Sequence, residues 1–278
     1  MKVYSKIEEI QDVILDLKSK GKSIGFVPTM GALHEGHLSL VEKSTQNCDF
    51  TIVSVFVNPT QFNNQLDLEN YPRTIEQDLE LLKSTSCDFV FTPSINEIYP
   101  ESFEKVNLNL GTLEHVMEGK HRPGHFDGVV NVVKRLFEIT LPTKAYFGLK
   151  DFQQVAVIKF MTNAFEMHVE IVACETLREP SGLAMSSRNQ RLSLTDREDA
   201  TIIFKTLQFA KANVHQYSPI ELIEQSMNFF NLGNLKLEYF EIVNPLTLES
   251  LENEWVKGAT ACIVAYCGNV RLIDNLEL

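Results

Sequence analysis

The sequence predicts an α/β protein in which a doubly wound parallel sheet is followed by a smaller C-terminal α+β domain. Over the first 175 residues, short apolar β-branched runs alternate with stretches of helical periodicity, as in strand–helix–strand units. The run at 50–57 (FTIVSVFV) is almost continuously apolar, as expected of a strand covered on both faces. After residue 175 this alternation stops, so we expect one domain over 1–175 and a second over 176–278.

The elements of the first domain follow from periodicity and from turn residues. Ile10, Ile14 and Leu17 recur at helical spacing and predict an opening helix over 7–19. The remaining elements are expected in this order: strand 22–28, helix 36–46, strand 50–57, helix 74–86, strand 88–91, strand 105–110, short helix 112–117, loop 119–125, helix 126–139, strand 145–147, helix 151–165 and strand 168–174.

The second domain is expected to start with a polar, loop-like segment at 178–191. Its last segment contains Gly268 and Asn269, a typical hairpin turn, which divides that segment into two strands. The regular elements are expected in this order: helix 195–213, helix 219–231, strand 235–243 and the strand pair 259–274.

Composition excludes several classes of function. The net charge of −12 argues against bulk binding to nucleic acid or to an anionic membrane surface. No apolar segment approaches the ~20 residues of a membrane span, and no signal peptide is recognisable. The five cysteines are scattered and odd in number, which indicates buried thiols in a reducing compartment. We therefore expect a cytoplasmic protein.

The segment 24–41 (IGFVPTMGALHEGHLSLV) carries the main functional prediction. A buried strand ends at a glycine-bearing loop, and a helix starts near Gly36, between His34 and His37. The first N–H groups of a helix lack intrahelical partners and the helix dipole is positive there, so anions bind at such a point. Two imidazoles beside it can donate to phosphoryl oxygens. A larger residue at Gly36 would take the space of a nucleotide.

A surface turn or half of a metal site is the alternative for these two histidines. Their spacing of three can place both imidazoles on one helix face. However, no cysteine or third histidine lies close by in the sequence to complete a tetrahedral zinc site. The pattern T-x-G-x-x-H-x-G-H resembles the nucleotidylyltransferase superfamily, which favours the phosphate site.

Further candidate binding residues, which are amides and cations, lie after the ends of other predicted strands or at the start of loops. Asn58 and Gln61 offer amides, which donate to a carboxylate and accept from a hydroxyl, and so suit a hydroxy acid. Arg122 and His125 precede a helix and offer two cations or donors. Turn chemistry alone is an equally good explanation of either pair.

Two later stretches suit a nucleotide. Lys150 can pair with the negative charge of a phosphate. Asp151 can accept hydrogen bonds from ribose hydroxyls, or it can simply cap the next helix. Gln154 on that helix would lie on the same face as Lys150 and Asp151. The stretch 185–189 (MSSRN) joins hydroxyls, a guanidinium and an amide in a loop. Such a loop suits a lid over a triphosphate, or a solvated linker between domains.

Taken in order, six motifs resemble those of one family, the pantoate–β-alanine ligases. They extend from about 22 to 191 and read PTMGALHEGH, VFVNPTQF, YPRT, RPGHFDGVV, FGLKDFQQ and REPSGLAMSSRN. The resemblance implies a Rossmann-like first domain and a ligase that forms pantothenate through pantoyl adenylate, with release of AMP and pyrophosphate. It also implies ATP, pantoate and β-alanine as partners, Mg²⁺ as cofactor, and a homodimer.

The resemblance further implies roles for single residues. Catalytic roles fall on His37, His34 and Lys150, with His37 as the proton donor. Asp78 would lie near the Mg²⁺–ATP region. The amides implied for pantoate and β-alanine are those of Gln61, Gln154 and Asn58. The residues implied for ATP are Met30, Gly31, Ala32, Leu33, His34, Glu35, Gly36, His37, Gly148, Leu149, Lys150, Asp151, Leu177, Met185, Ser186, Ser187 and Arg188.

Two positions depart from the family pattern: Leu149 stands where Glu is usual, and Ser181 where Asp is common. Neither is implied to touch a ligand through its side chain, so we expect activity to be intact. An H-x-G-H enzyme that transfers AMP to a phosphate acceptor and a non-catalytic nucleotide sensor are the alternatives. The amides of Asn58, Gln61 and Gln154 suit a hydroxylated acid and favour the ligase.

Overall fold

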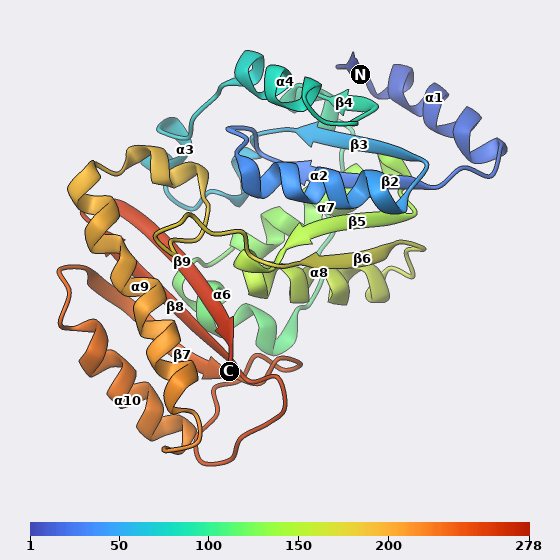
Figure 1. Ribbon diagram of the computed structural model, residues 1–278. Coiled ribbons are helices and arrows are strands. Elements are labelled where there is room, and N and C mark those ends of the chain that lie inside the picture. The colour runs from blue at the N-terminus through green and yellow to red at the C-terminus, as the bar shows by residue number, and fades with distance from the viewer. The chain divides into compact units, whose positions relative to one another are not determined.

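A computed structural model describes residues 1–278, and the chain divides into two compact units (Figure 1). The segments of unit 1 are Met1–Leu110, Arg122–Gly148 and Gln154–Cys174. The segments of unit 2 are Gly111–His121, Leu149–Gln153 and Glu175–Leu278. Unit 2 therefore takes two short pieces from the part of the chain before residue 175. A domain boundary at 175 stays a prediction.

Unit 1 contains a six-stranded parallel sheet in the order β1-β4-β3-β2-β5-β6. The chain leaves β2 toward β3 on one side and returns to β5 and β6 on the other, so the strand order reverses between β2 and β5. Ligands of such sheets bind beyond the carboxyl ends of the strands at this reversal. The predicted doubly wound sheet is confirmed. Its strands are β1 (Lys2–Tyr4), β2 (Ile24–Thr29), β3 (Phe50–Val55), β4 (Phe89–Phe91), β5 (Lys144–Gly148) and β6 (Glu170–Cys174).

Helices cover both faces of this sheet (Figure 1). On one face, α2 (Glu35–Asn47) packs on β2, β3 and β5, and shares an apolar cluster with α4 (Ile75–Lys83). On the other, α1 (Ile7–Ser19) packs against α7 (His125–Thr140), which also contacts β2. Right-handed crossovers produce this division between the faces. The other helical segments are η1 (Pro59–Gln61), α3 (Gln65–Glu69), α5 (Ile95–Ile98) and α8 (Phe152–Ala164).

The central strand β2 is buried on both faces, which is why its residues are apolar. Ile24, Phe26 and Val27 are each 0% exposed. Between them, Gly25 lets α2 approach closely, because a Cβ there would lie 2.1 Å from the Ser44 hydroxyl oxygen. The absence of a side chain at Gly25 therefore lets the last turns of α2 pack closely on the start of β2.

Unit 2 is an antiparallel sheet, in the order β7-β8-β9, with helices packed on it. α9 (Leu194–Asn213) packs on β8 and β9, and α10 (Pro219–Phe230) packs on β7 and α9. The predicted small α+β architecture is confirmed. Its strands are β7 (Lys236–Val243), β8 (Thr260–Cys267) and β9 (Val270–Glu277). Its shorter segments are η2 (Gly111–Glu114), α6 (Met117–His121), η3 (Leu149–Asp151) and η4 (Ser187–Arg191).

An ion-pair network holds α6 to the sheet of unit 2. Arg271 donates to both carboxylate oxygens of Glu118, at 2.8 and 2.7 Å, and also contacts Glu238. Tyr239 donates its hydroxyl to Glu118 at 2.9 Å. Burial works to lower the pKa of Arg271, but the two glutamates raise it above its ordinary range, so the guanidinium stays charged. This network explains why the segment Gly111–His121 belongs to unit 2.

Two local predictions are wrong, and one strand was missed. The sequence does not predict β1, because an edge strand of three residues is too short to show a pattern. Residues 105–110 form no strand, since the Asn131 side chain accepts from Val106 N at 2.9 Å and donates to Val106 O at 3.1 Å. The loop expected at 119–125 is helical as far as His121, where α6 ends.

Four of the five cysteines are buried, as the composition predicts, and Cys48 is half-buried. Cys87, Cys174, Cys262 and Cys267 are buried, and burial raises the pKa of the Cys87 thiol to about 12. None of the helices is long and apolar enough to cross a membrane.

Candidate active site

The loop between β2 and α2 turns through left-handed backbone and is held by a buried carboxylate. Gly31 and Ala32 have φ values of 81° and 49°. Asp78, which is 1% exposed, accepts from Ala32 N at 3.0 Å and from Leu33 N at 2.8 Å. The Thr74 hydroxyl donates to the same carboxylate at 3.3 Å. Asp78 thus fixes the backbone that leads into α2, and both of its oxygens are engaged in doing so.

We expect Asp78→Asn to loosen this loop. The amide keeps the size of the carboxylate, but its NH₂ group must face a backbone N–H, and such a mismatch typically costs about 1–3 kcal/mol. The free energy of unfolding, measured with denaturant, should fall by that amount. Asp12→Asn, on the exposed face of α1, is the matched control. Equal stability of the two variants would contradict a role for Asp78 in holding the loop.

The two histidines cap the first turn of α2. His34 is the N-cap, and its Nδ1 accepts from Gly36 N at 3.1 Å. The Nδ1 atom of His37 accepts from His34 N at 3.3 Å, which completes a capping box. The ring centroids are 4.1 Å apart. Because each Nδ1 accepts from a backbone N–H, each neutral ring carries its proton on Nε2. The start of α2 therefore has two imidazole Nε2–H donors, while the N–H groups of His34 and Gly36 are used in the capping box.

The amide pair after β3 is organised around Asn58, which is 1% exposed. Its Nδ2 donates to Gln61 Oε1 at 3.2 Å and to Gly128 O at 3.1 Å. Its Oδ1 accepts from the hydroxyls of Tyr99 and Thr60, at 2.9 and 3.0 Å. Burial raises the pKa of Tyr99, so this hydroxyl stays a donor. Asn58 is thus fully used inside the protein, and it orients Gln61.

Gln61 is also held through its own nitrogen and its backbone. Its Nε2 lies 2.8 Å from Met30 Sδ, which joins the ends of β2 and β3. Its carbonyl accepts from His125 Nδ1 at 2.7 Å, so Nε2 of this ring is the acceptor for Arg122 Nη1 at 3.1 Å. A Cβ at Gly128 would lie 2.6 Å from Gln61 Cα. The RPGHFDGVV motif therefore positions Gln61 from α7.

In unit 2, the lysine and aspartate of the GLKD motif lie on η3. Lys150 Nζ is 3.5 Å from Asp151 Oδ1, and their side chains are 17% and 45% exposed. The carbonyls of Leu149 and Lys150 accept from Asn275 Nδ2, at 2.8 and 3.0 Å. The Asp151 carboxylate is partly exposed, so it can contact solvent or a ligand.

The REPSGLAMSSRN motif folds into a turn followed by η4. Glu179 accepts from Arg197 at 3.0 and 3.1 Å and from Asn189 Nδ2 at 2.9 Å. Ser186 caps η4, since its hydroxyl accepts from Arg188 N at 3.3 Å. The Glu179 contacts hold both ends of the segment that carries the hydroxyls and the guanidinium implied for phosphate.

The predicted site residues therefore fall into two groups. Unit 1 joins Met30, Asn58 and Gln61 by hydrogen bonds and places His34 and His37 at the start of α2. Gly148 ends β5, and Gln154 is half-buried near the start of α8. In unit 2, the carbonyl of Leu177 accepts from Met185 N at 3.0 Å. Glu35, in the first turn of α2, is exposed.

Sequence reasoning missed several residues that hold the others. Tyr99 and Thr60 are ordinary in the sequence, and their contact with Asn58 depends on the fold. Asp274 and Asn275 lie near the C-terminus, where the sequence gives no local signal of a site. A structural role for Arg178 could have been suspected, because an Arg-Glu pair opens the polar segment that leads to the MSSRN stretch.

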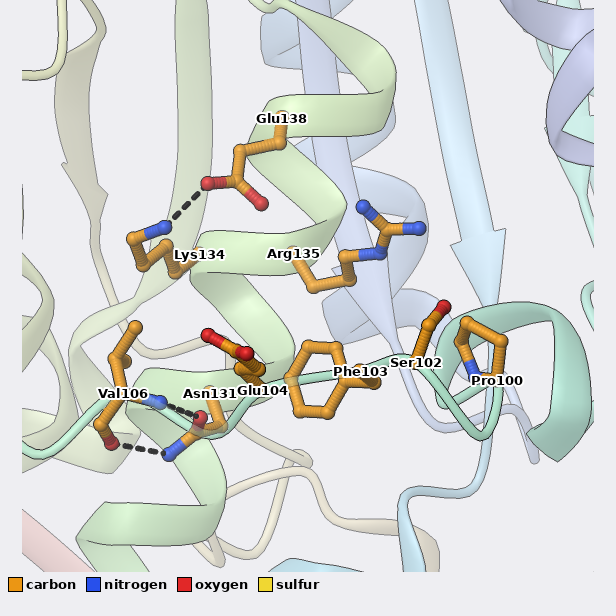
Figure 2. A pocket seen from close by; sticks show the side chains of 9 residues that line it. All are labelled: Pro100, Ser102, Phe103, Glu104, Val106, Asn131, Lys134, Arg135 and Glu138. Atoms are coloured by element: carbon orange, nitrogen blue, oxygen red, sulfur yellow. Dashed lines mark hydrogen bonds and ion pairs between the residues drawn. The ribbon is translucent and has the colours of Figure 1, made fainter.

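A surface cavity of about 290 Å³ lies in unit 1, between residues 100–106 and the outer side of α7 (Figure 2). Lys134 and Arg135 point away from each other in it. The charges of its lining cancel, because Glu104 and Glu138 accompany the two cations. Lys134 already pairs with Glu138. None of the predicted site residues lines the cavity, so we separate it from the candidate active site.

A parallel sheet whose reversal point runs through a glycine-bearing loop into an H-x-G-H helix start is the architecture of nucleotidyl-transferring α/β enzymes. The family model for Pantoate-beta-alanine ligase matches residues 2–277. The chain belongs to the pantoate–β-alanine ligase family. The chain is therefore a ligase. Its family membership argues against the alternative, an enzyme that delivers AMP to a phosphate acceptor.

Similar proteins cover the whole chain. A pantothenate synthetase of Porphyromonas gingivalis is 46% identical over 282 residues, with 100% of this chain and 99% of that protein covered. One of Christiangramia forsetii is 48% identical over 285 residues, with the same coverage. The crystal structure of the Thermus thermophilus enzyme has a TM-score of 0.94 at 39% identity, covering 100% of this chain and 99% of that one. The Francisella tularensis ligase, complexed with β-γ ATP and β-alanine, has a TM-score of 0.84 at 38% identity, covering 100% and 97%.

Proposed function

We propose that this chain joins pantoate to β-alanine through pantoyl adenylate, with ATP bound at the start of α2 and pantoate held by Gln61. The observation that carries the proposal is the pair of backbone bonds to the Nδ1 atoms of His34 and His37. Both bonds leave the imidazole protons on Nε2, where they can be donated. The Francisella tularensis ligase, complexed with β-γ ATP and β-alanine, supports ligands of the same kind for this chain.

In the first step, a carboxylate oxygen of pantoate attacks the α-phosphorus of ATP. The bond from that phosphorus to the bridging oxygen of pyrophosphate breaks, and pyrophosphate leaves with the bonding electrons. Negative charge grows on the leaving group and on the phosphoryl oxygens, so fixed donors lower the barrier. The Nε2–H groups of His37 and His34 would supply them, together with the positive end of the α2 dipole. We propose Lys150, Ser186, Ser187 and Arg188 as further phosphate contacts.

In the second step, the amine of β-alanine attacks the activated acyl carbon. A C–N bond forms, the bond from the acyl carbon to the phosphate oxygen breaks, and AMP leaves. The amine must lose a proton, which passes to AMP or to water. No protein nucleophile is needed, so the contribution of the chain is to position the reactants.

The amide of Gln61 suits this positioning, because Asn58 and Met30 fix both ends of it. Gln154 is proposed as the second pantoate amide. Gly148, Leu149, Asp151 and Leu177 are proposed for the ribose and adenine, with Met185 beside them. Asn58 and Asp78 support these groups from within the protein. The loop before α2 and the first turn of α2 would border the nucleotide. The residues proposed there are Gly31, Ala32, Leu33, Glu35 and Gly36.

We expect Gln61→Ala to weaken pantoate binding mainly, because the lost hydrogen bonds belong to that substrate. A loss of about 10-fold in pantoate affinity corresponds to one or two such bonds. ATP affinity should stay near normal. Isothermal titration of each ligand separately measures both, and Gln46→Ala, exposed on α2, is the matched control. A variant that lost ATP affinity and kept pantoate affinity would refute the assignment of Gln61.

The proposed Mg²⁺ would take few ligands from the chain. The Asp78 oxygens are taken by the Ala32 and Leu33 N–H groups, and no group of three or more His, Cys, Asp or Glu side chains could hold a metal ion. Mg²⁺ commonly binds through substrate phosphates with few protein ligands, so we propose that it arrives with ATP. A homodimer and a cytoplasmic location stay proposals, which sedimentation and cell fractionation would test.

The test of the reaction is direct. Purified protein should release AMP from ATP only when pantoate and β-alanine are both present, with pantothenate formed in equal amount. Mass spectrometry of the product and chromatography of the nucleotides measure the two yields. AMP release that required a phosphate-bearing acceptor instead would support an AMP transferase.

A further inference from the structure

Two neighbouring residues of β9, Asp274 and Asn275, are buried although both are polar. They are 4% and 9% exposed. A buried carboxylate and a buried amide are stable only when hydrogen bonds satisfy them. Their partners lie in two segments of unit 2 that flank residues proposed for ATP.

Asn275 holds the η3 turn. Its Nδ2 donates to the carbonyls of both Leu149 and Lys150, at 2.8 and 3.0 Å. A 3₁₀ turn of three residues satisfies few of its own carbonyls, so the Asn275 amide supplies a partner for these two. The amide therefore sets the position and tilt of the peptide from which the Lys150 side chain starts.

Asp274 holds the turn that precedes the MSSRN stretch. Its two oxygens accept from Arg178 Nη1 and Nη2, at 2.6 and 3.0 Å. Arg178 also donates to Gly182 O at 3.1 Å and to Asn275 O at 3.2 Å. Its guanidinium lies 4.1 Å from the centre of the Phe204 ring. One cation thus ties both ends of the 178–182 turn to β9.

We propose that Asp274 and Asn275 are positioning residues for ATP: one strand sets the backbone of Lys150 and the turn that leads to Ser186. Neither touches the nucleotide, and both act through residues that do. This inference rests on the role proposed above for Lys150. Because two adjacent residues of one strand anchor both segments, a shift of either anchor changes the ATP contacts and leaves Gln61, a pantoate amide of unit 1, in place.

The test is Asn275→Asp, which keeps the shape of the side chain. It replaces the NH₂ donor with a carboxylate oxygen that faces two carbonyl oxygens, so the η3 turn is pushed away. We expect the KM for ATP to rise by about 10-fold or more, while the KM for pantoate stays within about twofold. Asn269→Asp, in the exposed hairpin of the same sheet, adds the same charge and should leave both values unchanged.

A double-mutant cycle with Lys150→Ala separates this inference from the function it rests on. If Asn275 acts through Lys150, then Asn275→Asp should add less than about threefold to the ATP KM of Lys150→Ala. A full additional effect, or an unchanged ATP KM in Asn275→Asp alone, would overturn the inference. An unchanged ATP KM in Lys150→Ala would overturn the role of Lys150 itself. If Asn275→Asp does not fold, Asn275→Ala, which removes the donors without adding charge, is judged by the same results.

Discussion

His37→Asn should lower the rate of pantoyl adenylate formation by about 10²–10³-fold, the usual loss for one transition-state donor. The Oδ1 atom of asparagine can take the place of His37 Nδ1 and still accept from His34 N, so the helix cap survives. The Nε2–H donor is lost. Substrate affinities and the melting temperature should therefore change little. Single-turnover formation of the adenylate measures the rate, without interference from the second step.

Two other variants test whether the rate depends on the Nε2–H donor of His37 or on its role in the helix cap. In His37→Gln, the side-chain amide can place an N–H near the position of Nε2, so this variant should keep more activity than His37→Asn. His168→Ala, an exposed histidine, should keep the full rate. If His37→Asn formed the adenylate at the rate of the unchanged protein, the imidazole donor would not take part in the step.

Gly128→Ala should be the most damaging conservative change away from the nucleotide. The added Cβ would lie 2.4 Å from Thr60 O and 2.6 Å from Gln61 Cα, and both are backbone atoms that cannot rotate away. α7 must move outward, or the turn at 58–62 must shift with Gln61. Overpacking of this kind costs about 1–3 kcal/mol of stability, and a displacement of about 1 Å at a reacting group can cost 10²-fold in rate.

The expected result is a fall of about 10²-fold in kcat/KM for pantoate, with a lower free energy of unfolding. Steady-state kinetics and denaturant unfolding measure the two quantities. Glu138→Ala, exposed on the same helix, should leave both near their original values. Normal kinetics in Gly128→Ala would mean that the contact between α7 and the 58–62 turn does not position Gln61.

Much of the fold was predictable because the parallel strands are covered on both faces. β3 and β2 therefore read as continuous apolar runs, and the intervening helices show one apolar stripe. The strand predicted at 105–110 does not form, because a side chain takes the place of the neighbouring strand. Residues 105–110 contain alternating apolar residues like a strand, but Asn131 on α7 takes the backbone groups of Val106. Such a contact joins residues 25 apart and leaves no local trace in the sequence.

The candidate site divides in the same way. The H-x-G-H start of α2 is local, so its helix caps follow from a few adjacent residues. The contacts of the Asp78 carboxylate with Ala32 N and Leu33 N, by contrast, join residues 46 and 45 apart. Asn275 reaches Leu149 across 126 positions of the chain. Contacts of this range depend on the packing of sheets and turns, which periodicity and motif spacing do not specify.

The most direct measurement is the exchange of labelled pyrophosphate into ATP in the absence of β-alanine. If pantoate attacks the α-phosphorus and pyrophosphate leaves, the reverse reaction must return label to ATP whenever pantoate is present. We predict exchange that depends on pantoate and is lost in His37→Asn. Exchange that proceeds without pantoate, or AMP formation from all three substrates with no exchange, would contradict it.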